Sequence, residues 1–323
     1  MHLWLSSEIE LFPENYNQYS GIEFCLRCGY SFQEFLKSGK IGCGNCFISF
    51  QDAILPYKKI EKKFQHKKWE EFLSDKKKFF LNIQKKIPES EIENFHLALK
   101  KFTSQKFTKL IDLESQIFQN FPNSKVSFRY RIARNLKEFV YPVSKFGKET
   151  SIKTKIKTKV LKLFQSSASD KNKEDFVRFE SNLNCIFFDE DHFRLEFFSL
   201  NGKFFKFFKE YEIFFRLLNS KNLFDYFLGI GYITSCPTNI GLANKLSVYI
   251  DLPSFHEKEN WILESMVGDS FDFVLENVKI AKEEYPKTRL YIYKKNISKR
   301  QIFSFYEFVY FLLEFDKTRK ISK

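Results

Sequence analysis

Four of the six cysteines in this 323-residue chain lie within CLRCGYSFQEFLKSGKIGCGNCF, residues 25–47. They form two C-x-x-C pairs, Cys25/Cys28 and Cys43/Cys46, with fourteen residues between the pairs. Two such turns facing each other provide the four soft ligands of a tetrahedral zinc ion. We therefore predict one structural zinc ion in a closed shell, with no open position for catalysis. The alternative is a redox dithiol or a chance cluster, against which the identical form of both pairs argues.

The residues between the cysteines follow a specific pattern as well. Gly29, Gly42 and Gly44 are expected to take positive φ, because tight knuckle turns require it. The whole pattern resembles the zinc-binding activator of bacterial protein-arginine kinase. The matching positions are Cys25, Cys28, Phe32, Phe35, Gly39, Gly42, Cys43, Cys46, Phe47 and Phe50.

Two short helices are predicted at 90–104 and 106–120 from their apolar spacing. The activator ends in a helical hairpin shared with the excision-repair proteins B and C, and residues 97–119 resemble it. Its apolar positions fall on Phe107, Leu113 and Ile117. The resemblance implies that these side chains dock against a protein partner. Without the family, 90–120 is an amphipathic hairpin that packs into a core.

Three later segments bring arginine, acidic and cysteine side chains in a fixed order: SFRYRIARNLKEFVYP (127–142), FDEDHFR (188–194) and GYITSCPTNIG (231–241). In this order they resemble motifs of the phosphagen (ATP:guanidino) kinases, which include protein-arginine kinase. SVYIDLP (247–253) follows at the expected distance. The resemblance covers about 125–323 and implies an α+β catalytic domain with an antiparallel sheet flanked by helices.

The resemblance also assigns roles to single residues. Glu190 orients the acceptor guanidinium and takes its proton, and Cys236, flanked by Ser235 and Thr238, holds the guanidinium charge as a thiolate. ATP and Mg²⁺ are the ligands expected of such a site, because phosphoryl transfer depends on positioning and charge cancellation. The phosphates are expected to be held by Arg129, Arg131, Arg194 and Lys245. Without the family, each of these residues is ordinary: solvent-facing arginines, a polar turn and a buried small residue.

Departures from the kinase pattern bear on activity. Lys245 stands where the family has an arginine, which keeps the charge but loses the fork that binds two phosphate oxygens. Residues 273–286 contain neither arginine nor glycine, where the family has a further phosphate-binding arginine. The stretch between Pro142 and Cys185 is short, and the family's usual histidine is not visible there. We therefore predict a regulatory protein, a pseudokinase or adaptor in protein-arginine phosphorylation or stress proteolysis. An active protein-arginine kinase is the alternative.

The amino-acid composition bears on which classes of partner the protein binds. The chain has a formal net charge of +13 and 42 phenylalanines, which the codon usage of an AT-rich genome explains without reference to function. Protein partners, such as an arginine kinase or a stress-protease component, are expected. Nucleic acid and membrane are not expected, and a nucleic-acid-binding zinc protein is a distant third hypothesis. No signal peptide or long apolar segment is visible, which favours a cytoplasmic location.

The predicted organisation has four parts: an extension (1–20), a zinc module (21–52), a helical region (53–122) and a kinase-like domain (123–323). A long helix is expected at about 205–228 and a terminal helix at 299–319. Strands are expected within 183–200 and at 245–253, 271–278 and 288–296.

Overall fold

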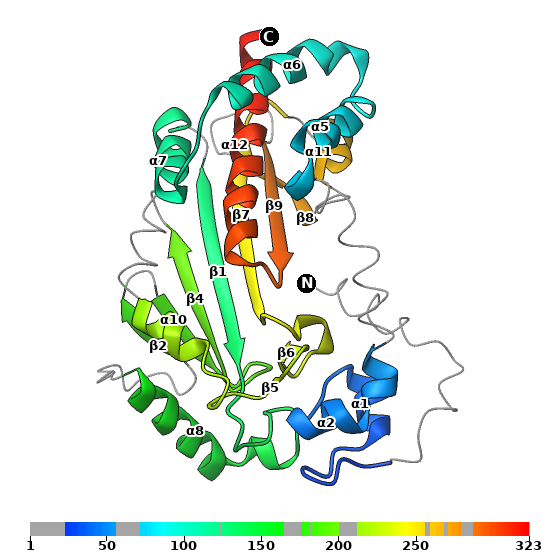
Figure 1. Ribbon diagram of the computed structural model, residues 1–323, viewed down its shortest axis with the longest axis vertical. Coiled ribbons are helices and arrows are strands. Elements are labelled where there is room, and N and C mark those ends of the chain that lie inside the picture. Colours follow the sequence, from blue (N-terminus) through cyan, green and yellow to red (C-terminus); the bar gives the residue numbers. More distant parts are fainter. Residues whose placement is uncertain are drawn as a thin grey trace. The chain divides into compact units, whose positions relative to one another are not determined.

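The computed structural model describes residues 23–55, 72–122, 125–164, 176–180, 183–199, 212–255, 259–267, 271–278 and 287–322. The chain forms two compact units, each assembled from separate stretches of sequence. Unit 1 comprises Met1–Lys62, Arg131–Phe197 and Glu212–Asn244. Unit 2 comprises Lys63–Tyr130, Phe198–Tyr211 and Lys245–Lys323. Most helices and strands of both are labelled in Figure 1.

Unit 1 combines the cysteine-rich segment with one half of the sheet. Its strands follow the order β2-β3-β4-β1, and β3 pairs antiparallel with both β2 and β4. Strand β1 runs on into unit 2. Its elements are α1 (Phe32–Ser38), α2 (Gly44–Ser49), β1 (Val126–Arg134), the 3-10 helix η3 (Phe146–Lys148), α8 (Thr150–Leu163), β2 (Phe176–Glu180), β3 (Leu183–Phe187), β4 (Phe193–Ser199), α10 (Glu212–Leu218), β5 (Tyr226–Phe227), β6 (Gly231–Tyr232) and the 3-10 helix η4 (Pro237–Asn239).

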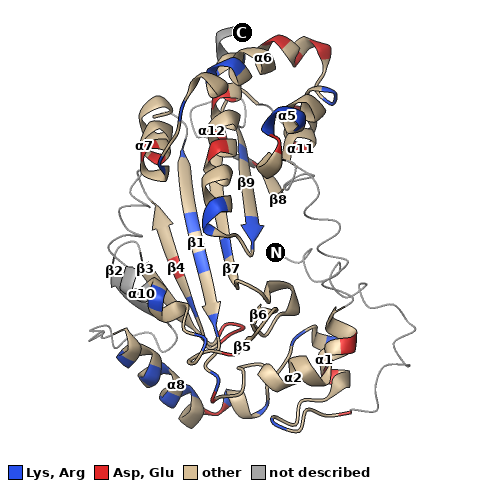
Figure 2. Cartoon of the chain, in the orientation of Figure 1, with Lys and Arg blue, Asp and Glu red and all other residues tan. Residues whose placement is uncertain are grey.

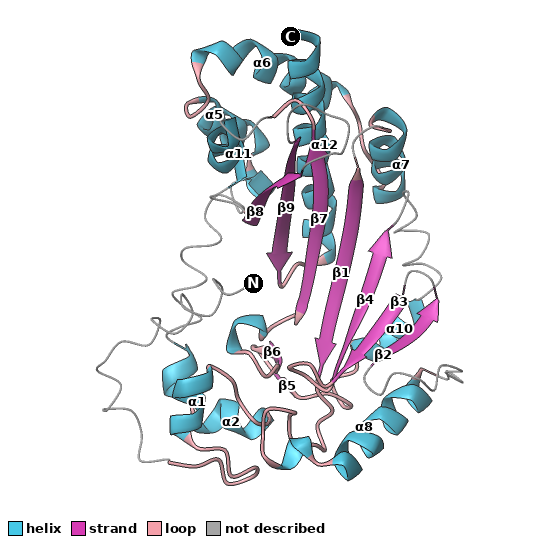
Figure 3. Cartoon of the chain, turned by 180° about the vertical axis from the view of Figure 1, so that it is seen from behind, coloured by secondary structure: helices cyan, strands magenta, loops and turns pink. Residues whose placement is uncertain are grey.

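In unit 2 the strands follow the order β1-β7-β9-β8, where β1 contributes its first part, and β9 pairs antiparallel with both of its neighbours. Helices α6 and α7 pack against α12. Figure 3, viewed from behind, shows α12 running along β7 and β9. The elements are α5 (Lys76–Gln84), α6 (Glu89–Ser104), α7 (Leu110–Asn120), β7 (Asn244–Leu252), α11 (Asn260–Val267), β8 (Asp272–Val278), β9 (Lys287–Lys295) and α12 (Lys299–Ser322).

Phenylalanine fills the interior of unit 2. The Phe80 and Phe311 ring centroids lie 4.6 Å apart, and Phe128 stacks on Tyr306 at 3.9 Å. Such ring pairs add to the stabilisation that burial of their apolar area already gives. The abundance of phenylalanine, attributed above to codon usage, therefore has a structural use in this core.

The predicted mixture of helices and antiparallel strands is confirmed, and strands β3, β4, β7, β8 and β9 lie where the alternation predicts them. The predicted long helix at 205–228 is wrong in its second half: α10 ends at Leu218. Residues beyond it pair with the end of β1 instead, since Lys137 N–H donates to the Leu223 carbonyl and Asp225 N–H to the Asn135 carbonyl. Residues 200–211 lie outside the described part of the chain, as do 1–22 and 56–71.

The two helices of the predicted hairpin are present as α6 and α7, but each packs against α12 more than against the other, and their apolar positions face inward. Leu113 and Ile117 are completely buried. The Phe107 ring lies 5.0 Å from that of Tyr310 on α12. The prediction that these residues dock against a partner is therefore wrong, and the reading of the hairpin as core is the correct one. Among the described helices, none combines the length and apolarity that a membrane span requires.

Candidate functional site

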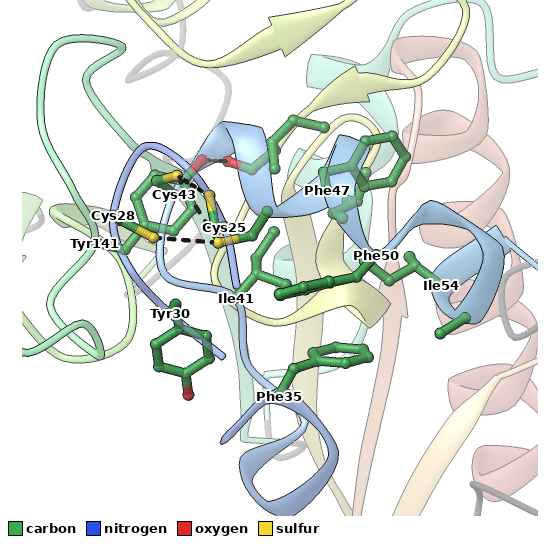
Figure 4. Packing of buried hydrophobic residues seen from close by; sticks show 14 residues of the cluster. Cys25, Cys28, Tyr30, Phe35, Ile41, Cys43, Phe47, Phe50, Ile54 and Tyr141 are labelled. Carbon is green, nitrogen blue, oxygen red and sulfur yellow. Dashed lines mark hydrogen bonds between the residues drawn. The ribbon is translucent and has the colours of Figure 1, made fainter. Parts of the chain in front are cut away.

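The four cysteines of the zinc module converge on one point in unit 1, where Figure 4 shows their sulfurs turned toward each other. The Sγ–Sγ distances are 3.6 Å for Cys25/Cys43, 3.3 Å for Cys28/Cys46 and 3.8 Å for Cys43/Cys46. A tetrahedron with zinc–sulfur bonds of about 2.3 Å has edges of about 3.8 Å. The observed spacing therefore fits a four-thiolate zinc site closely.

Burial of four thiols together favours a cation for electrostatic reasons as well. Hydrogen bonds with Cys25, Cys28 and Cys43 raise the pKa of Cys46 far above its ordinary value, and burial raises it further. The last thiol of the cluster thus resists ionisation unless positive charge is supplied. A divalent ion supplies that charge and lets all four thiols ionise.

Local sequence explains how the module folds. The Ser31 hydroxyl accepts from the Glu34 N–H while the Glu34 carboxylate accepts from the Ser31 N–H, a capping box that starts α1. Gly39 ends the helix in the left-handed region at φ 64°, and Gly29 turns the first knuckle at φ +65°.

The expectation of positive φ fails at Gly42 and Gly44, which lie outside that region. Glycine is favoured at these two positions because a Cβ atom would come too close to neighbouring side chains. A Cβ at Gly42 would lie 3.2 Å from the Cys28 sulfur, and one at Gly44 would lie 2.7 Å from the Asp225 carboxyl carbon. These two glycines allow close approach, first of the two knuckles and then of the rest of unit 1.

The zinc module is joined by backbone hydrogen bonds to the segment that carries Cys236. Ile41 N–H donates to the Ser235 carbonyl at 2.8 Å, and the Ser235 hydroxyl donates back to the Ile41 carbonyl at 3.3 Å. Tyr141 N–H donates to the Gly42 carbonyl at 2.7 Å. Tyr141 also lies in the same buried cluster as the four cysteines (Figure 4). The module is therefore an integral part of unit 1.

Asp225 strengthens this junction. Its carboxylate accepts from the Tyr141 hydroxyl at 2.7 Å and from the Gly44 N–H. Burial raises the pKa of Asp225 to about 6, although the hydrogen bond from Tyr141 and the charge of Arg27 act in the opposite direction. The side chain ties the start of α2 to the residues before β5.

Asp191 connects the acidic motif to the cysteine segment. Its Oδ1 accepts from Asn135 Nδ2 at 2.6 Å and from the Ser235 N–H at 2.7 Å. Burial raises the pKa of Asp191 to about 6, against the hydrogen bonds from Ser235 and Asn135. Because Asp191 follows Glu190 and Ser235 precedes Cys236, this contact fixes the spacing of the two predicted guanidinium residues.

His192 holds the other side of the acidic motif. Its Nδ1 accepts from the Leu136 N–H at 2.9 Å, and its Nε2 donates to the Val140 carbonyl at 2.7 Å. Burial lowers the pKa of His192 to about 4, so the ring is neutral near pH 7. The sequence analysis placed 188–194 in a kinase-like motif, with a polar turn as the reading without the family, and it assigned no positioning role to Asp191 or His192.

Glu190 and Cys236 meet at a cation supplied by the zinc module. The Lys40 ammonium donates to Glu190 Oε1 at 2.7 Å, and the charge of Cys236 acts with that of Glu190 to raise the pKa of Lys40. The Cys236 sulfur lies 3.1 Å from the Thr238 hydroxyl. Lys40 is only 24% exposed and Cys236 only 7%. Sequence reasoning did not identify Lys40, because 150 positions separate it from Glu190.

The predicted phosphate-binding cations are divided between the units. Arg129 and Arg131 share the half-buried face of β1, Arg129 in unit 2 and Arg131 in unit 1. In unit 1, Arg194 forms ion pairs with Asp189 at 2.5 Å and with Glu196 at 2.9 Å.

In unit 2, the Arg129 guanidinium lies 5.3 Å from the centroid of the Phe198 ring, and Lys245 Nζ lies 3.3 Å from that of Tyr293. The structure thus brings Glu190 and Cys236 together. The meeting of all six predicted residues stays a prediction.

Residues 125–267 match the family model of the ATP:guanido phosphotransferase C-terminal catalytic domain. This half of the chain therefore has the phosphagen-kinase type of fold. Residues 23–67 match the model of the McsA central zinc-finger domain. The chain joins a zinc-finger domain of the McsA type to a phosphagen-kinase-like catalytic domain, the fusion that its motifs predict.

One solved structure supports this fold, and two others are similar at lower scores. The duplicated taurocyamine kinase from Schistosoma mansoni with bound transition-state analogue components has a TM-score of 0.53 at 17% identity, covering 86% of this chain and 40% of that one. Its substrate-free form gives 0.49 at 17% identity, covering 86% and 41%. A lombricine kinase gives 0.41 at 12% identity, covering 62% and 68%. The chain spans about two fifths of the taurocyamine kinase chains. No curated sequence matches it.

Proposed function

We propose that this chain is a protein-arginine-kinase-like regulatory protein, whose kinase-like domain recognises an arginine guanidinium but transfers phosphate weakly or not at all. Glu190 and Cys236 are the guanidinium ligands. The observation that carries the proposal is the ion pair between Lys40 and Glu190 at 2.7 Å, in a place where the charge of Cys236 also acts on the Lys40 ammonium. A guanidinium has five N–H donors in a planar fork and can replace that cation at both acceptors.

Weak turnover follows from the cations assigned to the phosphates. Arg131, Arg194, Arg129 and Lys245 take that role in the proposal. Arg194 is already paired with Asp189 and Glu196, and Lys245 lies against the Tyr293 ring. Loss of a single electrostatic donor at a transition state costs on the order of 3 kcal/mol. A lysine in place of an arginine and a late segment without arginine therefore leave the spreading phosphoryl charge poorly compensated.

The zinc ion serves this function as scaffold. Its four thiolates close the shell, so that no coordination position is left for a substrate. In the proposal the metal holds residues 39–42 against Ser235 and so supports the cysteine segment. Partners are protein-arginine kinases or stress-protease components, as a zinc-finger domain of the McsA type suggests.

An active protein-arginine kinase is the second candidate. The retained pair of Glu190 and Cys236, with the Thr238 hydroxyl 3.1 Å from the sulfur, favours it. In that case Glu190 takes the proton of the attacking guanidinium nitrogen and Cys236 stabilises its charge.

One experiment separates the two candidates. The full-length chain is incubated with ATP, Mg²⁺ and an arginine-rich protein substrate, and acid-labile phosphoarginine is measured by mass spectrometry, with a nucleotide titration in parallel. The proposal expects arginine binding with little or no phosphoarginine. Formation of phosphoarginine at ordinary kinase rates, abolished by Glu190→Gln or Cys236→Ala, would establish the active kinase instead.

A further inference from the structure

The segment that carries Lys40 is fixed on both sides. Gly39 ends α1 in the left-handed conformation, and the N–H of Ile41 is bonded to the carbonyl of Ser235, the residue before Cys236. The Lys40 N–H donates to the Ser38 hydroxyl at 3.1 Å. Lys40 therefore lies on a short loop of the zinc module that is anchored next to the Cys236 segment, and its backbone is held in place.

Contacts at the tip of Lys40 are those that a substrate cation would make. Its ammonium donates to Glu190 Oε1 at 2.7 Å, and Ile41, the next residue, is bonded to the carbonyl of the residue before Cys236. Burial by itself lowers the pKa of Lys40, but the charges of Cys236 and Glu190 outweigh it and raise the pKa above the ordinary value. The amine is thus charged at neutral pH.

We propose that Lys40 is an internal pseudosubstrate: its ammonium occupies the acceptor-guanidinium subsite, and an arginine side chain binds there only by displacing it. The inference rests on the proposed function, because it takes Glu190 and Cys236 as the guanidinium ligands. It adds an occupant from the zinc-finger domain, which makes arginine binding depend on the state of that domain.

Competition follows from charge and geometry. A second cation at Glu190 would lie within a few ångströms of the Lys40 ammonium in a partly buried site, where like charges repel more strongly than in water. Lys40 also holds one of the two Glu190 carboxylate oxygens that a guanidinium fork would bind together. Arginine binding and the Lys40 contact therefore exclude each other.

The first arm of the test asks whether the contact exists in solution. Amine-reactive labelling followed by mass spectrometry compares Lys40 with Lys37, an exposed lysine on the same module. Lys40 is expected to react at least tenfold more slowly than Lys37 in the wild type, and Glu190→Gln is expected to remove most of that protection. Equal labelling of both lysines in the wild type would overturn the proposal.

The second arm measures binding of N-acetyl-arginine amide by titration calorimetry, with zinc content as the check on folding. Lys40→Met, which keeps the length and removes the charge, is expected to bind at least tenfold more tightly than the wild type. Lys37→Met is the matched control and is expected to bind as the wild type does. Lys40→Gln provides a second neutral variant, and Glu190→Gln added to Lys40→Met is expected to abolish the gain.

The outcomes distinguish the two levels of the argument. If the wild type binds arginine and Lys40→Met binds equally or more weakly, Lys40 is a positioning residue and the pseudosubstrate proposal is wrong, while the guanidinium site stands. If neither the wild type nor any Lys40 variant binds arginine while Lys40 is protected, the proposed guanidinium site itself is wrong, and the inference falls with it.

Discussion

In unit 1 the interior contains Asp191, His192 and Asp225, each with a hydrogen-bond partner within 2.9 Å. In unit 2 the middle of α12 is surrounded mainly by phenylalanine rings, and near the end of that helix the buried Arg319 pairs with Glu91 and Glu259. Figure 2 colours the acidic and basic positions along the helix. A buried polar group is tolerated only when its partner has the right position, so polar interiors fix orientation. Apolar interiors fix volume and tolerate exchange better. The polar contacts of unit 1 therefore orient Glu190 and Cys236, whereas the aromatic part of the unit 2 interior provides packing.

The difference between the two units should be largest when the metal is removed, because the metal lies in unit 1. We expect about one zinc per chain by metal analysis, and structural zinc sites in small domains contribute about 10–16 kcal/mol. A chelator or Cys46→Ser should abolish hydrogen-exchange protection in residues 23–55 and in the 231–240 segment bonded to them. Unit 2, whose core contains no part of the cluster, should stay protected.

Cys185→Ala is the control, since Cys185 lies buried on β3 outside the cluster. It should leave the zinc content unchanged. A chain that lacks zinc as purified, with freely reactive Cys25 and a protected 23–55 segment, would contradict the structural role of the metal.

A charge in the aromatic interior tests unit 2. Leu113→Asp places an unpaired carboxylate at a completely buried position on α7, which should cost about 4 kcal/mol or more. Ile111→Asp is the matched control, because Ile111 is 48% exposed on the same helix. Urea unfolding of both variants measures the difference. A folded Leu113→Asp chain that has lost only a protein complex would restore the docking reading of the hairpin.

Removing one polar anchor from unit 1 should cost less. Asp191→Ala leaves the Ser235 N–H and the Asn135 amide without their acceptor, and each buried unsatisfied donor costs about 1–3 kcal/mol. Arginine binding should fall as well, because the variant loosens the link between Glu190 and Cys236. Asp189→Ala is the comparison: Asp189 is about half exposed and pairs with Arg194, so its loss should have little effect on stability. Equal stability of the two variants would argue against a positioning role.

Some features of the two units could be predicted from the sequence, and others could not. The four cysteines and the strands follow from local spacing, which a sequence displays directly, and the kinase motifs follow from their resemblance to a known family. The end of α10 at Leu218 could not be predicted from local spacing, because residues 223–225 pair with the residues that follow β1, which is a tertiary contact. Lys40 could not be predicted either, since nothing in its neighbourhood indicates a carboxylate 150 residues away. Inward packing of Leu113 depends on α12, which is equally remote in sequence.

The smallest effect expected is a difference in pH dependence at His192. The folded ring has a pKa of about 4, whereas an unfolded histidine titrates near its ordinary value of 6.5. Between these values the unfolded chain binds a proton that the folded chain does not, so this residue's contribution to stability is lost as the pH falls from 6.5 toward 4.

His192→Gln keeps an acceptor and a donor for the Leu136 and Val140 backbone but cannot titrate. The stability of the wild type should therefore decline more steeply than that of the variant over this range, by at most about 1.4 kcal/mol per pH unit. Urea unfolding of the two proteins is compared at roughly pH 7.5, 6.5, 5.5 and 5.0, which span the titration of the ring. Protonation of Asp191, Asp225 and the zinc thiolates affects both proteins and largely cancels in the difference. Parallel curves would mean that His192 is already charged or solvated in the folded protein, and the polar interior of unit 1 would then be less closed than its hydrogen bonds indicate.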